Sequence, residues 1–173
     1  ICYANLNVKF GGAYCGMSDA LDGASHHATE DIAFMRALPN MKVIAPADAA
    51  AARWATKYAV ENYGPMYLRL SREVYPDLYT EDTKFELGKG AIVRDGSDVT
   101  VIACGIMVHK ALEAANLLEE RLISVRVVDM YSIKPIDREL IVKCAKETGA
   151  IVCAEEHNIH GGLGSAVSEL SLI

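Results

Sequence analysis

Short apolar runs alternate with helical segments along this chain, and that alternation constrains its fold more than any other feature. Strands that alternate with helices form parallel sheets whose two faces the helices cover. The alternation breaks once, in a polar, proline-containing stretch between residues 73 and 89. The sequence therefore predicts two consecutive parallel-sheet α/β units, at 1–75 and 90–173, joined by a linker at 76–89.

The first unit is expected to contain three strands and two helices. Thr29 is the predicted N-cap of the first helix, which Pro39 ends. Asp48 is the predicted N-cap of the second helix, an alanine-rich run that stops before Gly64. The strands are expected at residues 6–10, 42–45 and 66–72.

The second unit is expected to begin with a β-hairpin, because Asp95-Gly96 is a common turn pair between two apolar runs. Apolar residues then recur at helical spacing from Val108 to Leu122, and Asp137 is the predicted N-cap of a later helix. The other expected elements are strands at 91–93, 99–103, 125–128 and 150–154 and a last helix running to 173. The few strands at the start and the missing strand at the end predict a fragment of a longer chain.

Composition argues against several classes of protein. The 173 residues carry a net charge of −6 without a basic cluster, which argues against a nucleic acid or an anionic membrane as partner. The apolar runs are too short to span a bilayer, and no secretory signal is visible. Five cysteines, without a C-x-x-C pair, favour a reducing, cytoplasmic setting.

A long loop at residues 11–29 is the candidate functional segment, because structureless connections of this length are usually functional. It holds Asp22 and the adjacent His26 and His27, and Arg72 follows the third expected strand. Ligands of open α/β sheets sit at the carboxyl ends of strands. We therefore expect Asp22, His26 and Arg72 to converge on one site.

The first unit contains a series of recognisable blocks: DGASHH (22–27), EDIA (30–33), MRALPNM (35–41), PAD (46–48), GP (64–65) and LSR (70–72). The second unit contains two further stretches, 96–105 and 155–165, the latter with Glu-Glu-His and Gly-Gly-Leu-Gly-Ser. In order and spacing, the first series resembles the pyrimidine-binding domain of transketolases, and the second unit resembles the transketolase C-terminal domain.

The resemblance implies an enzyme that uses thiamine diphosphate and magnesium to move a two-carbon ketol unit between sugar phosphates. In that family the cofactor lies between two subunits. The family's aminopyrimidine-binding glutamate and its diphosphate- and magnesium-binding domain have no counterpart in this sequence. The chain alone is therefore expected to be inactive and to hold no assigned cofactor or metal residue. It would need the rest of its own polypeptide or an N-terminal partner subunit, in a homodimer or a heterotetramer.

Carried over by position, Asp22 is similar to the family aspartate that binds a donor hydroxyl. His26 is similar to the catalytic histidine that contacts the substrate near the reacting carbons, and Arg72 to the arginine that binds the sugar phosphate. Tyr14 stands where the family commonly has a substrate-binding histidine, and His27 is expected to be a bystander. The carboxylate of Asp22 suits hydroxyl recognition, the imidazole of His26 suits proton relay, and the guanidinium of Arg72 suits phosphate binding.

The loop also departs from the family pattern, at Tyr14, Asp19, Ala20 and Leu21. Tyrosine keeps a hydrogen-bond donor but lacks the cationic form of histidine, and alanine restricts backbone angles that glycine allows. We expect an atypical donor or acceptor sugar, whose identity stays open.

Alternative interpretations are a 1-deoxyxylulose-5-phosphate synthase-like enzyme, a 2-oxoacid dehydrogenase beta-like subunit, and a non-catalytic assembly subunit. The Leu-Ser-Arg sequence at 70–72 favours transketolase over the first of these. The assembly subunit is supported only by the departures in the loop.

Overall fold

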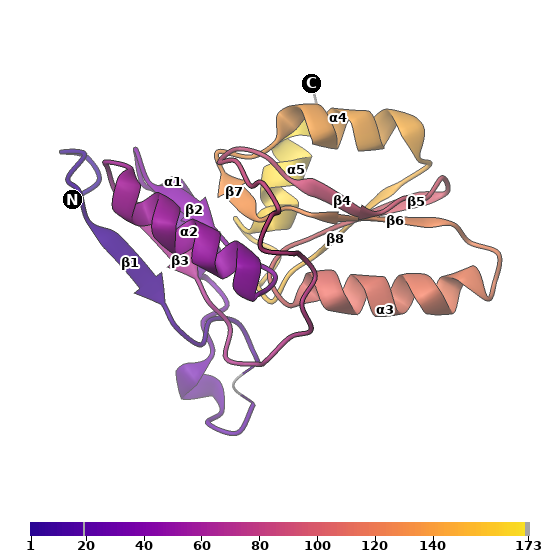
Figure 1. Ribbon diagram of the computed structural model, residues 1–173, viewed down its shortest axis with the longest axis horizontal. Coiled ribbons are helices and arrows are strands. Elements are labelled where there is room, and N and C mark those ends of the chain that lie inside the picture. The colour runs from indigo at the N-terminus through magenta and orange to yellow at the C-terminus, as the bar shows by residue number, and fades with distance from the viewer. Residues whose placement is uncertain (19, 172–173) are drawn as a thin grey trace.

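The computed structural model describes residues 1–18 and 20–171, and within them two four-stranded sheets carry helices on their faces (Figure 1). The first sheet has the order β1-β3-β2-β7 and the second the order β4-β6-β5-β8, so the expected α/β architecture is confirmed. The strands are β1 (Lys9–Gly12), β2 (Lys42–Ile44), β3 (Met66–Arg69), β4 (Ala91–Arg94), β5 (Val99–Ala103), β6 (Val125–Asp129), β7 (Ser132–Lys134) and β8 (Ile151–Ala154). The helices are η1 (Ala24–His26), α1 (Asp31–Ala37), α2 (Ala49–Glu61), α3 (Met107–Glu119), α4 (Arg138–Glu147) and α5 (Leu163–Ser171).

Strand β3 is the centre of the first sheet. It pairs in parallel with β1 on one side and with β2 on the other, and Met66 lies opposite both Lys9 and Lys42. All four of its residues are buried, because a central strand in a mostly parallel sheet is covered on both faces. The strand ends at Arg69 rather than at residue 72.

The first sheet is completed by β7, a strand that comes from the second half of the chain and that the sequence analysis did not predict. It runs antiparallel to β2, with Val43 opposite Lys134. The Lys134 ammonium donates to the carbonyls of Arg36 (2.7 Å) and Leu38 (2.5 Å), at the end of α1. The two sheets are therefore mixed rather than purely parallel, and the second half of the chain contributes to both.

The predicted hairpin around Asp95-Gly96 is wrong, because β6 lies between β4 and β5. Strand β6 is antiparallel to β4 and parallel to β5. The turn instead crosses the start of β6, where a Cβ on Gly96 would lie 2.3 Å from the Val125 carbonyl carbon. The Arg126 guanidinium donates to the Asp95 carboxylate (2.9 Å) and ties the turn there.

Two of the predicted N-caps are confirmed and one is wrong. The carboxylates of Asp48 and Asp137 accept the backbone N–H groups three residues on, as expected for N-caps. Helix α1 instead has Glu30 as its N-cap, and the Thr29 hydroxyl donates to the Glu30 side chain (2.8 Å).

Other boundaries differ from the expected ones at the ends of elements. The helix predicted up to Leu122 ends earlier, at Glu119. Leu122 lies beyond it, has a left-handed backbone (φ 61°) and is 93% exposed. The first strand begins at Lys9 rather than at residue 6. Asp19 and the predicted helix end at Ile173 lie outside the described residues.

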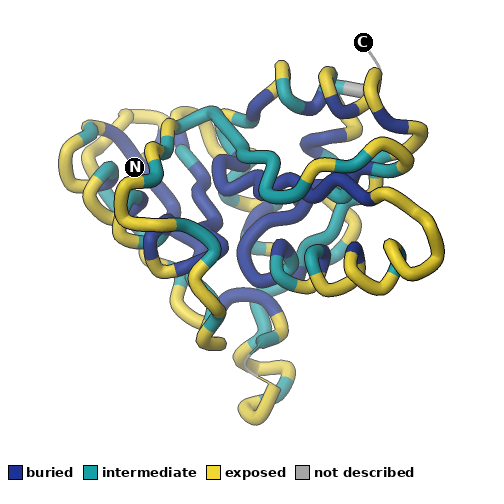
Figure 2. The backbone as a smooth tube through the Cα atoms, turned by 45° about the vertical axis from the view of Figure 1, so that its right-hand side comes forward, coloured by how far each residue is buried: buried dark blue, intermediate teal, exposed yellow. Residues whose placement is uncertain are grey.

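The largest hydrophobic cluster contains residues from both halves of the chain, and buried backbone runs through both of them (Figure 2). The cluster combines Ile32 and Val43 from the first half with Ile102, Val128 and Ile141 from the second. The predicted boundaries of the two units and their linker stay a prediction. Among the described helices, none has the length and apolar character that crossing a membrane requires.

Substituting Gly96 should destabilise the second sheet. A methyl group at this position would overlap the backbone of Val125 and Arg126, so we expect Gly96→Ala to lower the free energy of unfolding by about 1–3 kcal/mol. Gly11→Ala is the matched control, because nothing lies within 4 Å of the added Cβ there. Urea unfolding of both variants measures the difference, and equal values would contradict the proposed close approach.

Candidate functional site

The site loop, residues 13–30, projects from the carboxyl end of β1 at the bottom of Figure 1 and carries η1. Backbone hydrogen bonds close its base: the Gly16 N–H donates to the Ala28 carbonyl, and the Cys15 N–H to the Leu70 carbonyl, both at 3.0 Å. Arg72 follows the carboxyl end of β3 at the same edge of the sheet. This is the position where ligands bind to open α/β sheets.

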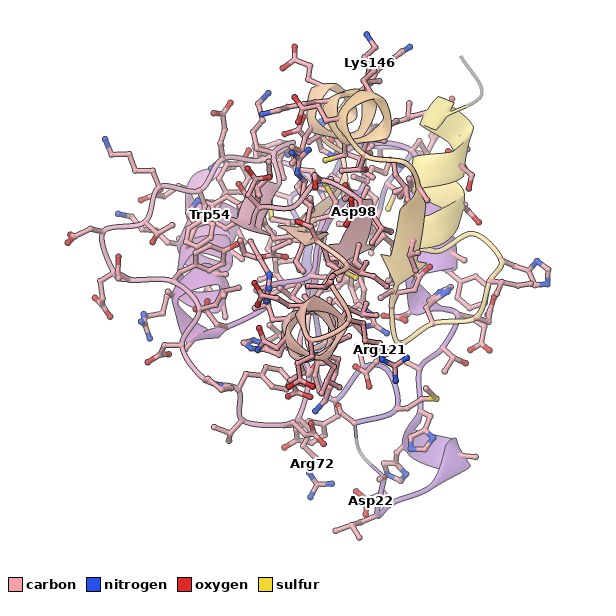
Figure 3. All side chains as sticks on the ribbon, turned by 90° about the vertical axis from the view of Figure 1, so that its right-hand side faces the viewer. Asp22, Trp54, Arg72, Asp98, Arg121 and Lys146 are labelled. Atoms are coloured by element: carbon pink, nitrogen blue, oxygen red, sulfur yellow. The ribbon has the colours of Figure 1, made fainter. Side chains whose placement is uncertain are left out.

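Three of the four predicted site residues lie in contact. The Arg72 guanidinium donates to the Asp22 carboxylate at 2.8 Å, and its central carbon lies 5.3 Å from the centre of the Tyr14 ring. Figure 3 shows Asp22 and Arg72 near each other at the tip of the molecule, where their side chains are 46% and 42% exposed. Of the three residues expected to converge, Asp22 and Arg72 meet as an exposed ion pair, and the convergence of His26 with them stays a prediction.

The histidines lie further along the same loop. His26 ends η1 and is exposed, and its Nδ1 lies 3.0 Å from the Ser25 hydroxyl. His27 is half-buried. The roles predicted for His26 and His27 stay predictions.

Tyr14 has an unusual backbone conformation. Its φ of 61° lies in the left-handed region, which costs a residue with a Cβ about 1–2 kcal/mol. The side chain is half exposed and faces Arg72. The fold therefore keeps a strained tyrosine at the place where its ring stacks on the arginine.

A buried polar network beneath the loop was not predicted. Arg69, at the end of β3, is 4% exposed and binds the Asp31 carboxylate with two nitrogens, at 2.8 and 3.2 Å. The Tyr67 hydroxyl donates to the same carboxylate at 2.7 Å, and the Cys15 thiol lies 3.1 Å from that hydroxyl. Arg69 is the charged last residue of an otherwise apolar strand, and this contrast is the feature of the sequence that could have indicated the network.

The electrostatics of this network favour a structural role. Burial acts to raise the pKa of Asp31, but the hydrogen bonds and charge of Arg69 outweigh it and hold that pKa below the usual range. Burial raises the pKa values of Tyr67 and Cys15. The thiol and the phenol thus stay protonated near neutral pH, and Cys15 is not an activated nucleophile.

Asp129 is a second buried acid that the sequence analysis missed. It is fully buried at the end of β6, and its Oδ2 accepts a hydrogen bond from the Tyr79 hydroxyl at 2.8 Å. Its Oδ1 has no hydrogen-bond partner among the described residues. Burial, with the nearby charge of Asp48, raises the pKa of Asp129 to about 7 despite the Tyr79 bond.

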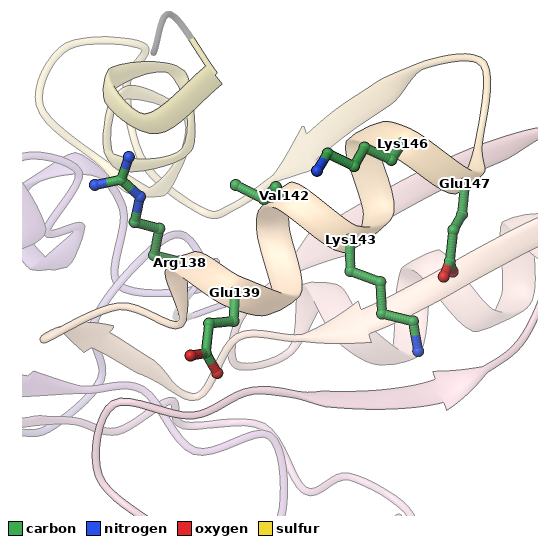
Figure 4. Close-up of a pocket in the computed structure, with 6 residues that line it drawn as sticks. All are labelled: Arg138, Glu139, Val142, Lys143, Lys146 and Glu147. Carbon is green, nitrogen blue, oxygen red and sulfur yellow. The ribbon is translucent and has the colours of Figure 1, made fainter.

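Two pockets differ in their relation to the loop. One has a volume of about 240 Å³ and lies next to Arg72, where β2 and β3 end and α2 begins. Its lining includes Pro46, Asp48, Ser71 and Tyr75. The other, of about 520 Å³, is lined only by α4 residues and lies on the opposite side of the molecule from the loop (Figures 1 and 4). Within residues 1–18 and 20–171, no group of three His, Cys, Asp or Glu could hold a metal ion.

Removing Asp31 should be far more costly than removing the exposed acid Asp22. Asp31→Ala leaves the buried Arg69 charge without its partner, and we expect a loss of about 3–5 kcal/mol in unfolding free energy. Asp22→Ala breaks an exposed Asp–Arg pair whose nitrogen–oxygen distance is also 2.8 Å and should cost less than about 1 kcal/mol. Chemical denaturation at neutral pH compares them, and similar losses would argue against the anchoring role of Arg69.

Asp129 should make stability fall as pH rises. Its pKa is higher in the folded state than the ordinary value of 3.8, so folding favours the protonated acid. The stabilisation is complete below the ordinary pKa and is lost as pH rises through about 7. Between about pH 5 and pH 8 we expect roughly 2–3 kcal/mol of this loss in the wild type and its disappearance in Asp129→Asn. Urea unfolding at the two pH values tests this, and the same slope in both proteins would contradict it.

Comparison with known proteins agrees with this architecture. The transketolase pyrimidine binding domain model matches residues 2–77, and the transketolase C-terminal domain model matches residues 88–171. An apulose-4-phosphate transketolase subunit of Phocaeicola vulgatus is 43% identical, over 98% of this chain and 54% of its own length. The 6-deoxy-6-sulfo-D-fructose transketolase subunit SqwH of Clostridium sp. (strain MSTE9) is 41% identical, over 98% of this chain and 52% of its own.

A solved structure described as a split gene transketolase, inactive beta4 tetramer, is 53% identical and superposes with a TM-score of 0.90. The alignment covers 98% of this chain and 55% of that one, so the chain spans about half the length of the relatives it matches. The two family models together match nearly the whole sequence. The chain therefore belongs to the transketolase family and contains its pyrimidine-binding and C-terminal regions.

Proposed function

We propose that this chain is part of a thiamine-diphosphate-dependent transketolase and supplies residues that bind the substrate. The enzyme would transfer a two-carbon ketol unit between sugars that carry an anionic end group. The observation that carries this proposal is the cluster of Tyr14, Asp22 and Arg72 at the carboxyl edge of the first sheet. A guanidinium fork stacked on an aromatic ring suits a tetrahedral oxyanion.

The names of the relatives support an anionic substrate. One relative is named for a sugar phosphate and another for a sulfo sugar, and both end groups are tetrahedral oxyanions. Arg72 supplies the charge for such a group, and the Tyr14 hydroxyl supplies a donor beside it.

Within the proposed site, Asp22 accepts a hydrogen bond from a substrate hydroxyl. His26 donates to, or relays a proton at, the oxygen that becomes an alkoxide near the reacting carbons. The thiamine cofactor, when bound, supplies the carbanion chemistry. The family resemblance assigns the magnesium and the diphosphate to regions beyond this chain, and the described residues offer no metal-binding cluster.

The ion pair of Asp22 with Arg72 makes substrate binding a competition. An incoming oxyanion competes with the Asp22 carboxylate for the N–H groups of the guanidinium. Because exposed pairs are worth only about 0.2–1 kcal/mol, displacing the carboxylate costs little, and it frees Asp22 to accept a hydroxyl.

The proposed enzyme works as an assembly. We infer that this chain is inactive alone and acts with the rest of its own polypeptide or with an N-terminal partner subunit, as a homodimer or heterotetramer. The solved relative, a split-gene protein in an inactive beta4 form, supports this inference. The relatives named for transketolases favour that activity over the synthase and dehydrogenase alternatives.

Arg72 and His26 should affect different kinetic constants of the assembled enzyme. We expect Arg72→Ala to raise KM for a phosphorylated sugar about ten-fold or more, because it removes binding of the end group. His26→Ala should lower kcat about 10²–10⁴-fold, because it removes proton transfer. Arg53→Ala is the control, since Arg53 forms an exposed pair with Glu81 on the surface of α2. A coupled ketol-transfer assay gives both constants, and identical kinetics for the Arg72 and Arg53 variants would refute the assignment.

Removing the competing carboxylate should strengthen anion binding. We expect Asp22→Asn to bind inorganic phosphate up to about five-fold more tightly than the wild type, while Arg72→Ala loses this binding. Glu73→Gln is the control, because it makes the same change in net charge at the residue next to Arg72. Calorimetric titration with phosphate measures the affinities. An equal gain from both substitutions would show that only net charge matters.

A further inference from the structure

Three consecutive residues of the second half of the chain hold both legs of the site loop. They follow β8 and are Glu156, His157 and Asn158, referred to below as the clamp segment. Strand β8 lies in the second sheet, whereas the loop starts after β1 of the first sheet and ends at α1, which packs on β2 of that sheet. The contacts therefore connect the two halves of the chain at the candidate site.

The near leg of the loop rests on Glu156. The Met17 N–H donates to Glu156 Oε1 at 3.0 Å, and the Glu156 residue is only 7% exposed. Gly16 packs directly on this side chain: a Cβ at that position would lie 2.6 Å from Glu156 Oε2, and its φ of 84° favours glycine. The chain at this point is thus shaped to lie against a buried carboxylate.

The far leg is held by Asn158. Its backbone N–H and its side-chain amide both donate to the Thr29 carbonyl, each at 2.9 Å. His157 Nε2 accepts the Ala33 N–H of α1 at 3.3 Å, so the ring proton is on Nδ1, which donates to the Asn158 carbonyl at 2.7 Å. The second residue of the clamp thereby supports the third and the helix that follows the loop.

The clamp segment is itself fixed from below by the buried Arg69. The guanidinium of Arg69 donates to the Glu156 carbonyl at 2.9 Å and to the Ala28 carbonyl at 3.2 Å. One buried cation therefore fixes the clamp and the far leg together. Between the two legs the loop is polar, and Asp22 and His26 are exposed at its tip. A segment with little core of its own depends on hydrogen bonds at its ends for a defined shape.

We propose that Glu156 and Asn158 are positioning residues for the site loop, so that the second half of the chain sets the spacing of Tyr14, Asp22 and Arg72. The catalytic meaning of this spacing rests on the proposed function. The positioning itself is a property of the fold and is measured without substrate.

Hydrogen exchange of the protein in its assembled form tests the proposal. We expect Glu156→Ala to speed amide exchange in the peptide covering 13–18 about ten-fold or more, because a hydrogen bond to a buried carboxylate is lost. Glu155→Ala is the matched control: its carboxylate accepts the N–H groups of Leu163 (2.6 Å) and Gly164 (2.9 Å) and should loosen only the start of α5.

Two further variants keep the test decisive if Glu156→Ala fails to fold. Glu156→Gln keeps an acceptor oxygen for the Met17 N–H and should restore most of the protection. Asn158→Ala keeps the backbone bond to Thr29 but loses the side-chain bonds to Thr29 and from the His160 N–H, and should speed exchange near 28–30 and at His160.

The proposal is overturned if the loop peptides keep their protection in these variants, if Glu155→Ala loosens the loop equally, or if exchange rises as much in β5 and β6 as in the loop. In the assembled enzyme, the loosened variants should raise KM for a phosphorylated sugar at least about three-fold, with Glu156→Gln closer to wild type. If exchange changes as expected but Arg72→Ala has unaltered kinetics, the clamp stands and the proposed function fails.

Discussion

The buried ion pair of Arg69 with Asp31 is the interaction on which the arrangement of the site depends. It connects the end of β3 with the start of α1, and the same guanidinium reaches the backbone carbonyls of Ala28 and Glu156. A buried pair contributes little net stability, because desolvation offsets the attraction, but a charge left without its partner is costly. The pair therefore acts mainly by excluding other arrangements of these four segments.

The sequence predicted the features that arise from local chemistry or from a general rule of sheet topology. The alternation of apolar and helical segments, the N-caps at Asp48 and Asp137, and the meeting of Asp22 with Arg72 all appear in the structure. Each follows from propensity, from capping, or from the rule that parallel strands end at one edge. The family resemblance added candidate roles that spacing alone did not supply.

The features that were missed depend on partners far along the chain. Strand β7 has three residues, too few for a periodic signal, and its partner β2 is about ninety residues earlier. The Asp-Gly pair at 95–96 indicated a hairpin, but the choice between a hairpin and an inserted strand depends on β6, which is not local. Arg69 looked like one basic residue in Leu-Arg-Leu-Ser-Arg, and only the packing of Asp31 and Glu156 shows that it is an anchor.

The site loop has two legs that hydrogen bonds fix and a tip that is exposed, and this division bears on which of its side chains can vary. The attachment points Met17 and Thr29 are bound through backbone atoms, which do not depend on side-chain identity. Ala20 and Leu21, which depart from the family pattern, are exposed at the tip. Substitutions there change the exposed surface of the loop and leave the hydrogen bonds of the clamp and of Arg69 in place. The contacts that fix the shape of the loop are therefore separate from the exposed side chains at its tip.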